Sequence, residues 1–225
     1  MLFLPCVVKA QSGELVEVRD FETWNSVGIE YKLNKKWDFG LQQQLRLENN
    51  SSELKNYFTQ MEAQYELFKN FKLGLGLRYI NVNDNKGAIQ GMEQYFRYQL
   101  DASFGHKLKR FKLNYRLRYQ NKRELFLESY DVPNLNQAWR FRLKLDYNIR
   151  SWKIDPYLAG ELFNTYQDGQ NNGLTDYRLI LGANYNLKIY GKLGVFYGIE
   201  NELTGSYPKT TNIVRIKYTY ILKNK

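Results

Sequence analysis

The sequence predicts an all-β protein: a transmembrane, antiparallel up-and-down β-barrel. Eleven stretches alternate apolar and polar residues with a period of two, so each stretch has one apolar and one polar face. Tyr, Phe and Trp gather at both ends of these stretches, as they do at the two interfaces of a membrane. The connections alternate between short and long, which is typical of outer-membrane barrels.

The predicted strands are long for a soluble sheet. A clear example is Trp37-Asp-Phe-Gly-Leu-Gln-Gln-Gln-Leu-Arg-Leu-Glu48, in which aromatic residues and leucines occupy every second position except Gln43. Another is Phe71-Lys-Leu-Gly-Leu-Gly-Leu-Arg-Tyr79. In chain order, strands are expected at residues 24–33, 37–48, 56–67, 71–81, 94–104, 111–120, 138–149, 153–164, 175–187, 193–200 and 211–222.

The connections fall into two classes. Short ones are expected at residues 34–36, 68–70, 105–110, 150–152 and 188–192, and longer ones at 49–55, 82–93, 121–137, 165–174 and 201–210. In outer-membrane barrels the short turns face the periplasm and the longer loops face outward. The alternation therefore predicts a location in the bacterial outer membrane, with the lipids of that membrane as partners.

The same alternation predicts the number of strands. Strand 211–222 follows a long loop and ends on the periplasmic side, whereas strand 24–33 precedes a short turn and starts outside. A periplasmic N-terminus then requires one more crossing, for which residues 14–19 are the only candidate. We therefore expect about twelve strands, with about ten as the alternative if the terminal segments do not close the sheet.

The composition agrees with one barrel domain. The chain has 225 residues, of which 43% are hydrophobic, and its mean hydropathy is -0.61. This low value excludes a bundle of membrane helices but not a barrel, because only every second strand residue meets lipid. No linker or charge block divides the sequence, so residues 11–225 are expected to form a single domain.

Residues 1–10 are interpreted as the remainder of a signal peptide. An apolar run ends in Val8-Lys9-Ala10, a small-x-small cleavage pattern, so the mature chain is expected to begin at Gln11. Cys6 offers the alternative of a lipoprotein acylation site, but Pro5 stands where such a site has a small residue. We expect Cys6 to be removed with the signal, which leaves the mature chain without thiol chemistry.

The formal net charge is +10. A basic balance often indicates nucleic-acid binding, but the cations are spread over turns and polar strand faces, and no basic helix accompanies them. We therefore expect no nucleic-acid partner and assign the cations to the turns and the lumen.

One side of the predicted strands carries no charge and is expected to meet lipid. It includes Leu41, Leu45, Leu75, Leu77, Leu117, Leu143, Leu181 and Ile216. Aromatic belts are expected near the short turns at Trp37, Phe39, Phe71, Phe104, Phe111, Tyr147 and Trp152, and near the long loops at Tyr57, Tyr79, Tyr119, Trp139, Tyr177 and Tyr197. A soluble sandwich is the weaker alternative, because its strands seldom reach about ten residues.

The opposite side is highly charged and is expected to face the lumen. The candidate site is a lumen charge network of Arg46, Glu62, Arg78, Arg97, Arg116, Arg118, Arg140, Arg142, Glu161, Arg178, Glu200 and Arg215. In a small barrel the side chains nearly fill the lumen, so arginines and carboxylates should pair across it. A ladder of ion pairs that plugs the barrel is favoured over a narrow, anion-leaning pore or a site for a charged ligand.

The sequence offers no catalytic constellation, so we expect the protein not to be an enzyme. Barrel hydrolases use a nucleophile with a histidine base, and the single histidine, His106, lies in a predicted short turn beside lysines. No Cys/His cluster suits zinc, and the loop 81–86 offers calcium only one carboxylate, Asp84. No metal or cofactor is therefore expected.

Several motifs together resemble a known family. They are Trp24 with the hairpin through Lys35-Lys36-Trp37, Gln42-Gln-Gln-Leu-Arg46 with Glu48, Gly74-Leu-Gly-Leu-Arg-Tyr79, Tyr115-Arg-Leu-Arg-Tyr119, Trp139-Arg-Phe-Arg142, Glu161-Leu-Phe163 and Tyr177-Arg-Leu-Ile-Leu-Gly182. In order and spacing they are similar to the Gram-negative outer-membrane proteins grouped as domain-of-unknown-function family twenty-four-ninety. The resemblance spans nearly all of the mature chain, implies an outer-membrane barrel and supplies no activity.

Two functions remain open at this point. The leading expectation is a non-enzymatic, integral outer-membrane barrel that forms a narrow passive channel. The alternative is a structural barrel that docks other envelope proteins. Single-channel conductance separates them, because a plugged scaffold does not conduct.

Overall fold

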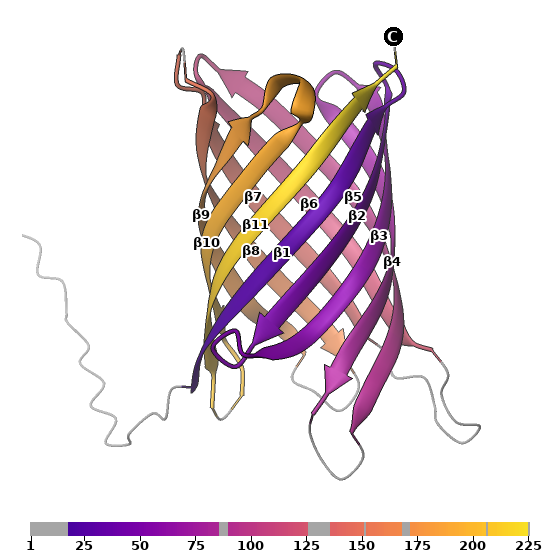
Figure 1. The fold of residues 1–225 in the computed structure, drawn as a ribbon, viewed down its shortest axis with the longest axis vertical. Coiled ribbons are helices and arrows are strands. Elements are labelled where there is room, and N and C mark those ends of the chain that lie inside the picture. Colours follow the sequence, from indigo (N-terminus) through magenta and orange to yellow (C-terminus); the bar gives the residue numbers. More distant parts are fainter. Residues whose placement is uncertain are drawn as a thin grey trace, which may run out of the picture.

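The structure is a computed structural model that describes residues 18–85, 90–125, 136–150, 152–167, 172–205 and 207–224. These residues build one closed barrel (Figure 1). The expected signal peptide, with Cys6, lies outside the described residues. Within them, no helix has the length and apolar character that crossing a bilayer requires.

Eleven strands form the barrel wall, each hydrogen-bonded to the next in chain order. They are β1 (Val18–Lys32), β2 (Trp37–Glu48), β3 (Glu53–Phe68), β4 (Phe71–Asp84), β5 (Gly91–Leu108), β6 (Phe111–Glu124), β7 (Asn136–Tyr147), β8 (Ile154–Gln167), β9 (Gly173–Asn186), β10 (Lys192–Glu202) and β11 (Lys209–Lys223). A single 3-10 turn, η1 (Lys188–Tyr190), connects β9 to β10. The predicted all-β barrel is confirmed.

The strand number differs from the expected twelve or ten because the closing pair is parallel. β1 and β11 run side by side from Val18↔Lys209 to Lys32↔Lys223, whereas all the other neighbouring pairs are antiparallel. The expectation of an even number assumed an antiparallel closure. One parallel pair removes that requirement, and Val18 and Arg19 of the proposed extra crossing are the first residues of β1.

The connections sort to the two ends of the barrel, as the sequence predicts (Figure 1). At one end the turns are short: β3 reaches β4 through Lys69 and Asn70, and β5 reaches β6 through Lys109 and Arg110. Asn70 (φ 71°) and Lys109 (φ 55°) adopt the left-handed conformation that tight hairpins need. We call this the short-turn end, and the opposite end, where β1 begins, the long-loop end.

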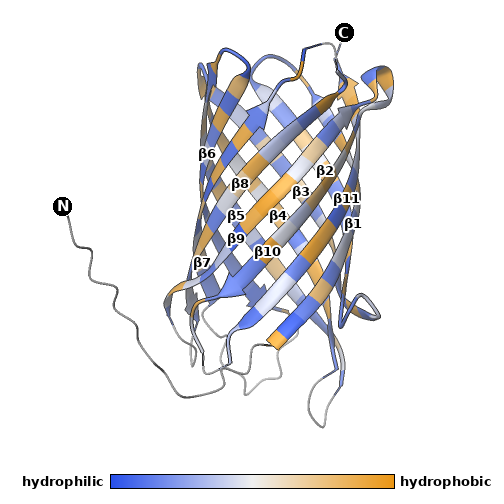
Figure 2. Cartoon of the chain, turned by 90° about the vertical axis from the view of Figure 1, so that its left-hand side faces the viewer, coloured by the Kyte–Doolittle hydropathy of each residue, from blue (hydrophilic) through white to orange (hydrophobic). Residues whose placement is uncertain are grey.

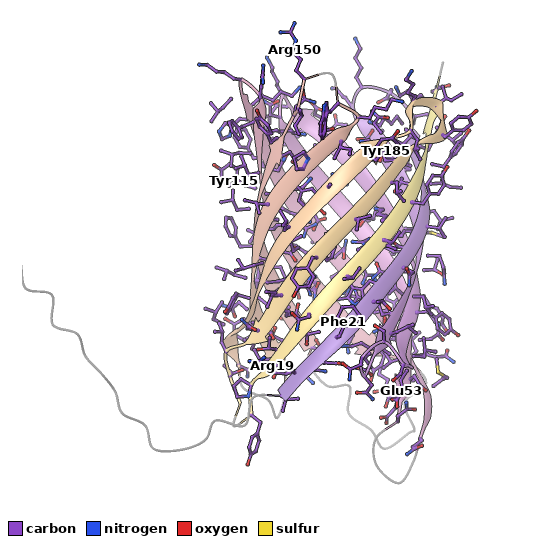
Figure 3. All side chains as sticks on the ribbon, turned by 60° about the vertical axis from the view of Figure 1, so that its left-hand side comes forward. Arg19, Phe21, Glu53, Tyr115, Arg150 and Tyr185 are labelled. Atoms are coloured by element: carbon purple, nitrogen blue, oxygen red, sulfur yellow. The ribbon has the colours of Figure 1, made fainter. Side chains whose placement is uncertain are left out.

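The two faces of the wall differ in chemistry, and Figure 2 shows the alternation of apolar and polar positions along each strand. The predicted apolar face is on the outside: Val27, Met61 and Leu181 are 55%, 60% and 59% exposed. Aromatic side chains project from the outer wall toward both ends; Tyr115 and Tyr185 mark the short-turn end in Figure 3. The predicted assignment of faces is therefore the one that the barrel adopts.

The packed core of the protein lies inside the barrel. Its apolar part is a cluster of inward side chains from five strands: Trp24, Tyr157, Ala159, Ile180, Phe196 and Ile213. Gly182 permits this packing, because an added Cβ would lie 2.5 Å from the ring of Tyr157 on the neighbouring strand. The lumen is thus filled by aromatic as well as charged side chains.

Candidate functional site

All twelve residues of the predicted lumen charge network lie on the inner side of the wall. Strand register aligns five of them in one row across β6 to β10. In this row the directly opposed pairs are Arg116↔Arg142, Arg142↔Glu161, Glu161↔Arg178 and Arg178↔Glu200. Since side chains of directly opposed residues are neighbours, this row creates a continuous chain of charges inside the barrel.

Glu161 is the centre of that row, and its side chain is only 3% exposed. Its Oε1 lies 2.7 Å from Arg116 Nη2, and its Oε2 lies 3.0 Å from Arg140 Nη2 and 3.1 Å from Arg178 Nη1. Arg142 Nε is farther from Oε1, at 3.8 Å. One carboxylate therefore lies within 4 Å of four guanidinium groups and is the shared anion of this part of the lumen.

The remaining carboxylates pair in ways that the sequence did not fully predict. Asp101 accepts two hydrogen bonds from Arg118, from Nε at 2.6 Å and from Nη2 at 2.7 Å, and Glu200 pairs with Arg178. Glu62, expected to face arginines, instead accepts hydrogen bonds from the side-chain amides of Gln60 and Gln99. The four arginines of β6 and β7 in the network, Arg116, Arg118, Arg140 and Arg142, thus meet Glu161 and Asp101, not Glu62.

Within the described part of the chain, four arginines of the network lack carboxylate partners: Arg46, Arg78, Arg97 and Arg215. Aromatic rings take the place of anions for the first two. The guanidinium carbon of Arg46 lies 3.8 Å from the centre of the Trp24 ring, and that of Arg78 lies 3.6 Å from the centre of the Phe58 ring. Such cation–π contacts contribute about 0.5–2 kcal/mol each, more when water is excluded.

These inward aromatic residues are functional neighbours that our sequence analysis missed. Phe58 is on the same face of β3 as Glu62, and Phe163 is on the same face of β8 as Glu161, so counting by two could have found them. Phe163 lies under Arg140, at 4.3 Å, and under Arg178, at 5.0 Å. The lumen is therefore built from stacked arginines and rings as well as ion pairs.

The network carries a surplus of positive charge. Its nine arginines face three glutamates of the network and Asp101, which leaves five more cations than anions. Two pairs of like charge, Arg116↔Arg142 and Arg118↔Arg140, are directly opposed on β6 and β7. Like charges in this position destabilise a sheet, so the arrangement favours an additional anion in the lumen.

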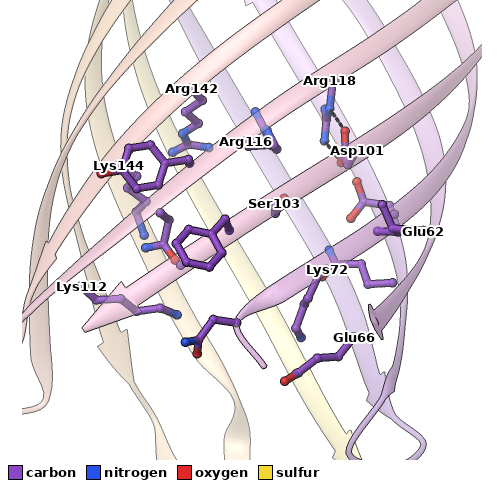
Figure 4. Close-up of a pocket in the computed structure, with 18 of the residues that line it drawn as sticks. Glu62, Glu66, Lys72, Asp101, Ser103, Lys112, Arg116, Arg118, Arg142 and Lys144 are labelled. Atoms are coloured by element: carbon purple, nitrogen blue, oxygen red, sulfur yellow. Dashed lines mark hydrogen bonds and ion pairs between the residues drawn. The ribbon is translucent and has the colours of Figure 1, made fainter. Parts of the chain in front are cut away.

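A cavity of about 500 Å³ opens from this network toward the short-turn end (Figure 4). We call it the vestibule. Its walls come from β3 to β7, and its charged lining residues are Glu62, Glu66, Lys72, Asp101, Lys107, Lys112, Arg116, Arg118, Arg142 and Lys144. In the vestibule, solvent thus reaches charged residues of the lumen.

Three carboxylates lie together outside the lumen charge network. Asp20, Glu22 and Glu48 bring carboxylate oxygens within 4.8 Å of one another near the long-loop end. Lys55 contacts Glu22 and Glu48, and Lys209 contacts Asp20 at 2.9 Å, so each of these carboxylates already has a lysine partner.

His106 was expected in a turn, but it lies in β5. It is on the outer surface between the rings of Phe104 and Tyr115, at 6.1 Å and 5.9 Å. The extra length of β5 explains this difference, since the hairpin turn contains only Lys109 and Arg110. His106 is thus separated from the charged lumen by the barrel wall.

Comparison with known proteins identifies a family. Residues 21–206 match the model of a family described as "Protein of unknown function (DUF2490)". No curated protein matches the chain. The match covers nearly the whole closed sheet, from β1 to the connection between β10 and β11. The chain therefore belongs to the DUF2490 family of proteins of unknown function.

Proposed function

We propose that this protein is a non-enzymatic, integral outer-membrane β-barrel with an occluded lumen, which acts as a structural barrel. The observation that carries the proposal is that every strand places a buried side chain inside the wall. In chain order these include Trp24, Gln44, Phe58, Ile80, Arg97, Arg118, Ala138, Glu161, Arg178, Phe196 and Ile213. A continuous water-filled pore would leave such a ring of inward residues wet.

The outer surface supports the membrane part of the proposal. A closed sheet has no edge, so its backbone groups are paired without water, as a bilayer requires. Apolar side chains cover the outside, and aromatic rings contact one another near both ends, for example Phe111 with Tyr147 and Tyr119 with Trp139. The outward polar residues Gln43 and Thr59 satisfy each other by a hydrogen bond. Such a surface is stable in lipid and poorly soluble in water.

Cysteine labelling in intact cells tests the topology. In a Cys6→Ser background, Leu203→Cys at the long-loop end should react with a membrane-impermeant maleimide, because the long loops face outward in this orientation. Lys36→Cys, in the turn between β1 and β2 at the short-turn end, should react only after the cells are opened. The reverse pattern would contradict the orientation, and labelling of both sites in intact cells would contradict an outer-membrane location.

Conductance in planar bilayers tests the occluded lumen. The purified protein should give no steady single-channel currents, because inward side chains close the barrel. As a matched control, the double variant Trp24→Ala and Phe58→Ala removes two of the rings that fill the lumen and should raise the conductance. Steady currents from the unmodified protein would overturn the proposal.

A narrow passive channel remains the second candidate, and the surplus of arginines favours it. In that case the currents of the unmodified protein should be anion-selective, because the lumen charge network together with Asp101 carries five more cations than anions. Arg116→Glu should then shift the selectivity toward cations. Absence of current in both proteins would leave the structural barrel.

A further inference from the structure

We propose that the vestibule at the short-turn end is a binding site for a phosphate-bearing ligand, held by Arg142, Lys112 and Lys144 with Arg116 at its floor. This inference does not depend on whether the barrel conducts. It depends on the charge and geometry of one cavity, in which the protein leaves cations without an adequate anion.

Most cations of the vestibule already have partners. Arg118 makes its two hydrogen bonds to Asp101, and Lys72 lies 2.6 Å from Asp38. Arg116 lies 2.7 Å from Glu161, and Lys144 pairs with Asp146. These groups form the frame of the cavity, and their internal ion pairs hold them in place before a ligand arrives.

Two cations on the β6–β7 wall of the vestibule, Arg142 and Lys112, are left without an adequate anion. Arg142 approaches Glu161 only to 3.8 Å, and its buried Nε has no hydrogen-bond partner among the described residues. Lys112 makes no ion pair within the described part of the chain. The carboxylate directly opposite Lys112 is Asp146, which already accepts hydrogen bonds from Asn114 and Lys144. The vestibule therefore offers two positive charges to a ligand.

The donors form a ladder along two neighbouring strands. Going from the floor to the mouth, the opposed pairs are Arg116↔Arg142, Asn114↔Lys144 and Lys112↔Asp146. Figure 4 shows Arg116, Arg142, Lys144 and Lys112 on one side of the cavity, with Glu66 and Lys72 across from them. A ligand that enters from the short-turn end thus meets an ammonium group first and the guanidinium groups last.

This set of donors fits a phosphate group better than a carboxylate. A phosphate monoester carries about 1.5 to 2 negative charges and three terminal oxygens, which match two unpaired cations and a guanidinium fork. A carboxylate would neutralise only one of them. The cavity volume of about 500 Å³ lies within the range of small-molecule sites, so it accommodates an ester as well as the phosphate itself.

Binding would also relieve a strain of the free protein. The opposed Arg116 and Arg142 repel each other. Both approach Oε1 of Glu161, but Arg116 Nη2 lies 2.7 Å from it and Arg142 Nε lies 3.8 Å away. A phosphate oxygen between Arg142 and Lys144 supplies the missing anion at the place where it is needed. The ligand therefore stabilises the fold as it binds.

The test is titration of the detergent-solubilised protein with inorganic phosphate, followed by calorimetry and by the thermal unfolding temperature. Acetate and chloride at equal ionic strength serve as controls for screening. We expect saturable binding of phosphate and a higher unfolding temperature. Arg142→Gln and Lys112→Gln should each weaken the binding about tenfold, because each removes a charged hydrogen-bond donor.

Lys217→Gln is the matched control. Lys217 is an inward lysine of β11 that lines a neighbouring cavity of about 210 Å³ and not the vestibule itself, so this variant should bind phosphate like the unmodified protein. Lys112 lies at the open mouth, so Lys112→Gln decides the outcome even if Arg142→Gln fails to fold. Equal effects of phosphate, acetate and chloride, or equal loss in Lys217→Gln and Lys112→Gln, would overturn the proposal.

Competition identifies the source of the phosphate group. If the ligand is a soluble ester, dissolved glycerol phosphate should displace inorganic phosphate from the vestibule. Phosphatidic acid in mixed micelles displaces it if the ligand is a lipid headgroup that reaches the mouth from the membrane. Either result supports the site, and displacement by neither would overturn it.

Discussion

The two halves of the lumen surround their inward arginines with different partners. In the half toward the long-loop end, Arg46 and Arg78 lie against the rings of Trp24 and Phe58, with no carboxylate at ion-pair distance in the described residues. In the half toward the short-turn end, arginines such as Arg116 lie among carboxylates and around the water-accessible vestibule. The surroundings of an inward arginine therefore differ with its depth in the barrel.

The aromatic partners in one half of the lumen and the carboxylate partners in the other suit the two halves to different roles. Aromatic faces exclude water and fill space, so Phe58 is only 1% exposed and this half closes the barrel. Carboxylates are smaller and leave room, so Arg142 keeps 24% of its side chain exposed and this half forms a cavity. One half serves as a plug and the other as a site that can accept an anion.

The largest expected loss of stability comes from a substitution at Glu161, which lies between the two halves of the lumen. Glu161→Gln leaves the shape almost unchanged but removes the only buried anion shared by Arg116, Arg140, Arg142 and Arg178. We expect a loss of about 3–5 kcal/mol in the free energy of unfolding, because several buried cations lose their partner. Denaturant titration in detergent measures it. Glu66→Gln, in the vestibule wall, is the control and should change stability little; equal losses would show that the two positions do not differ.

A somewhat smaller effect is expected on the outer face. Leu75→Arg places a charge in the middle of β4 on the side expected to meet lipid and should cost about 2–4 kcal/mol. Lys72 is on the opposite face of the same strand, and Lys72→Gln loses only its partly exposed pair with Asp38, worth about 1 kcal/mol or less. Folding into lipid vesicles at increasing urea concentration measures both. A similar cost for the two variants would contradict the assignment of faces.

The smallest effect distinguishes the plug from the vestibule. Phe58→Leu keeps an apolar side chain but removes the ring beneath Arg78 and beside Arg46, so the cost should be about 1–2 kcal/mol. The same denaturant titration measures it. Phe104→Leu, on the outer surface, is the matched control and should cost less. If Phe58→Leu were silent, the rings would fill space without stabilising the arginines.

The sequence predicted which face of each strand points outward, but it did not predict how the first and last strands pair to close the barrel. Positions such as Leu75 and Leu181 could be assigned to the outside because side chains alternate strictly along a strand. The parallel pairing of β1 with β11 could not be predicted in this way, because alternation along one strand says nothing about the direction of a neighbour that is nearly 200 residues away. The expectation of an even strand number failed for that reason.

For the lumen charge network too, some features could be predicted from the sequence and others could not. The sequence by itself determined the eleven alternating segments, their two faces and the charges of the inner face, because these follow from local spacing and residue type. Only the tertiary structure decided that Glu161 serves four arginines, that Glu62 binds glutamines, and that Arg46 and Arg78 lie on aromatic rings. Partners inside a closed barrel come from different strands, so register and curvature, which are properties of the whole sheet, select them.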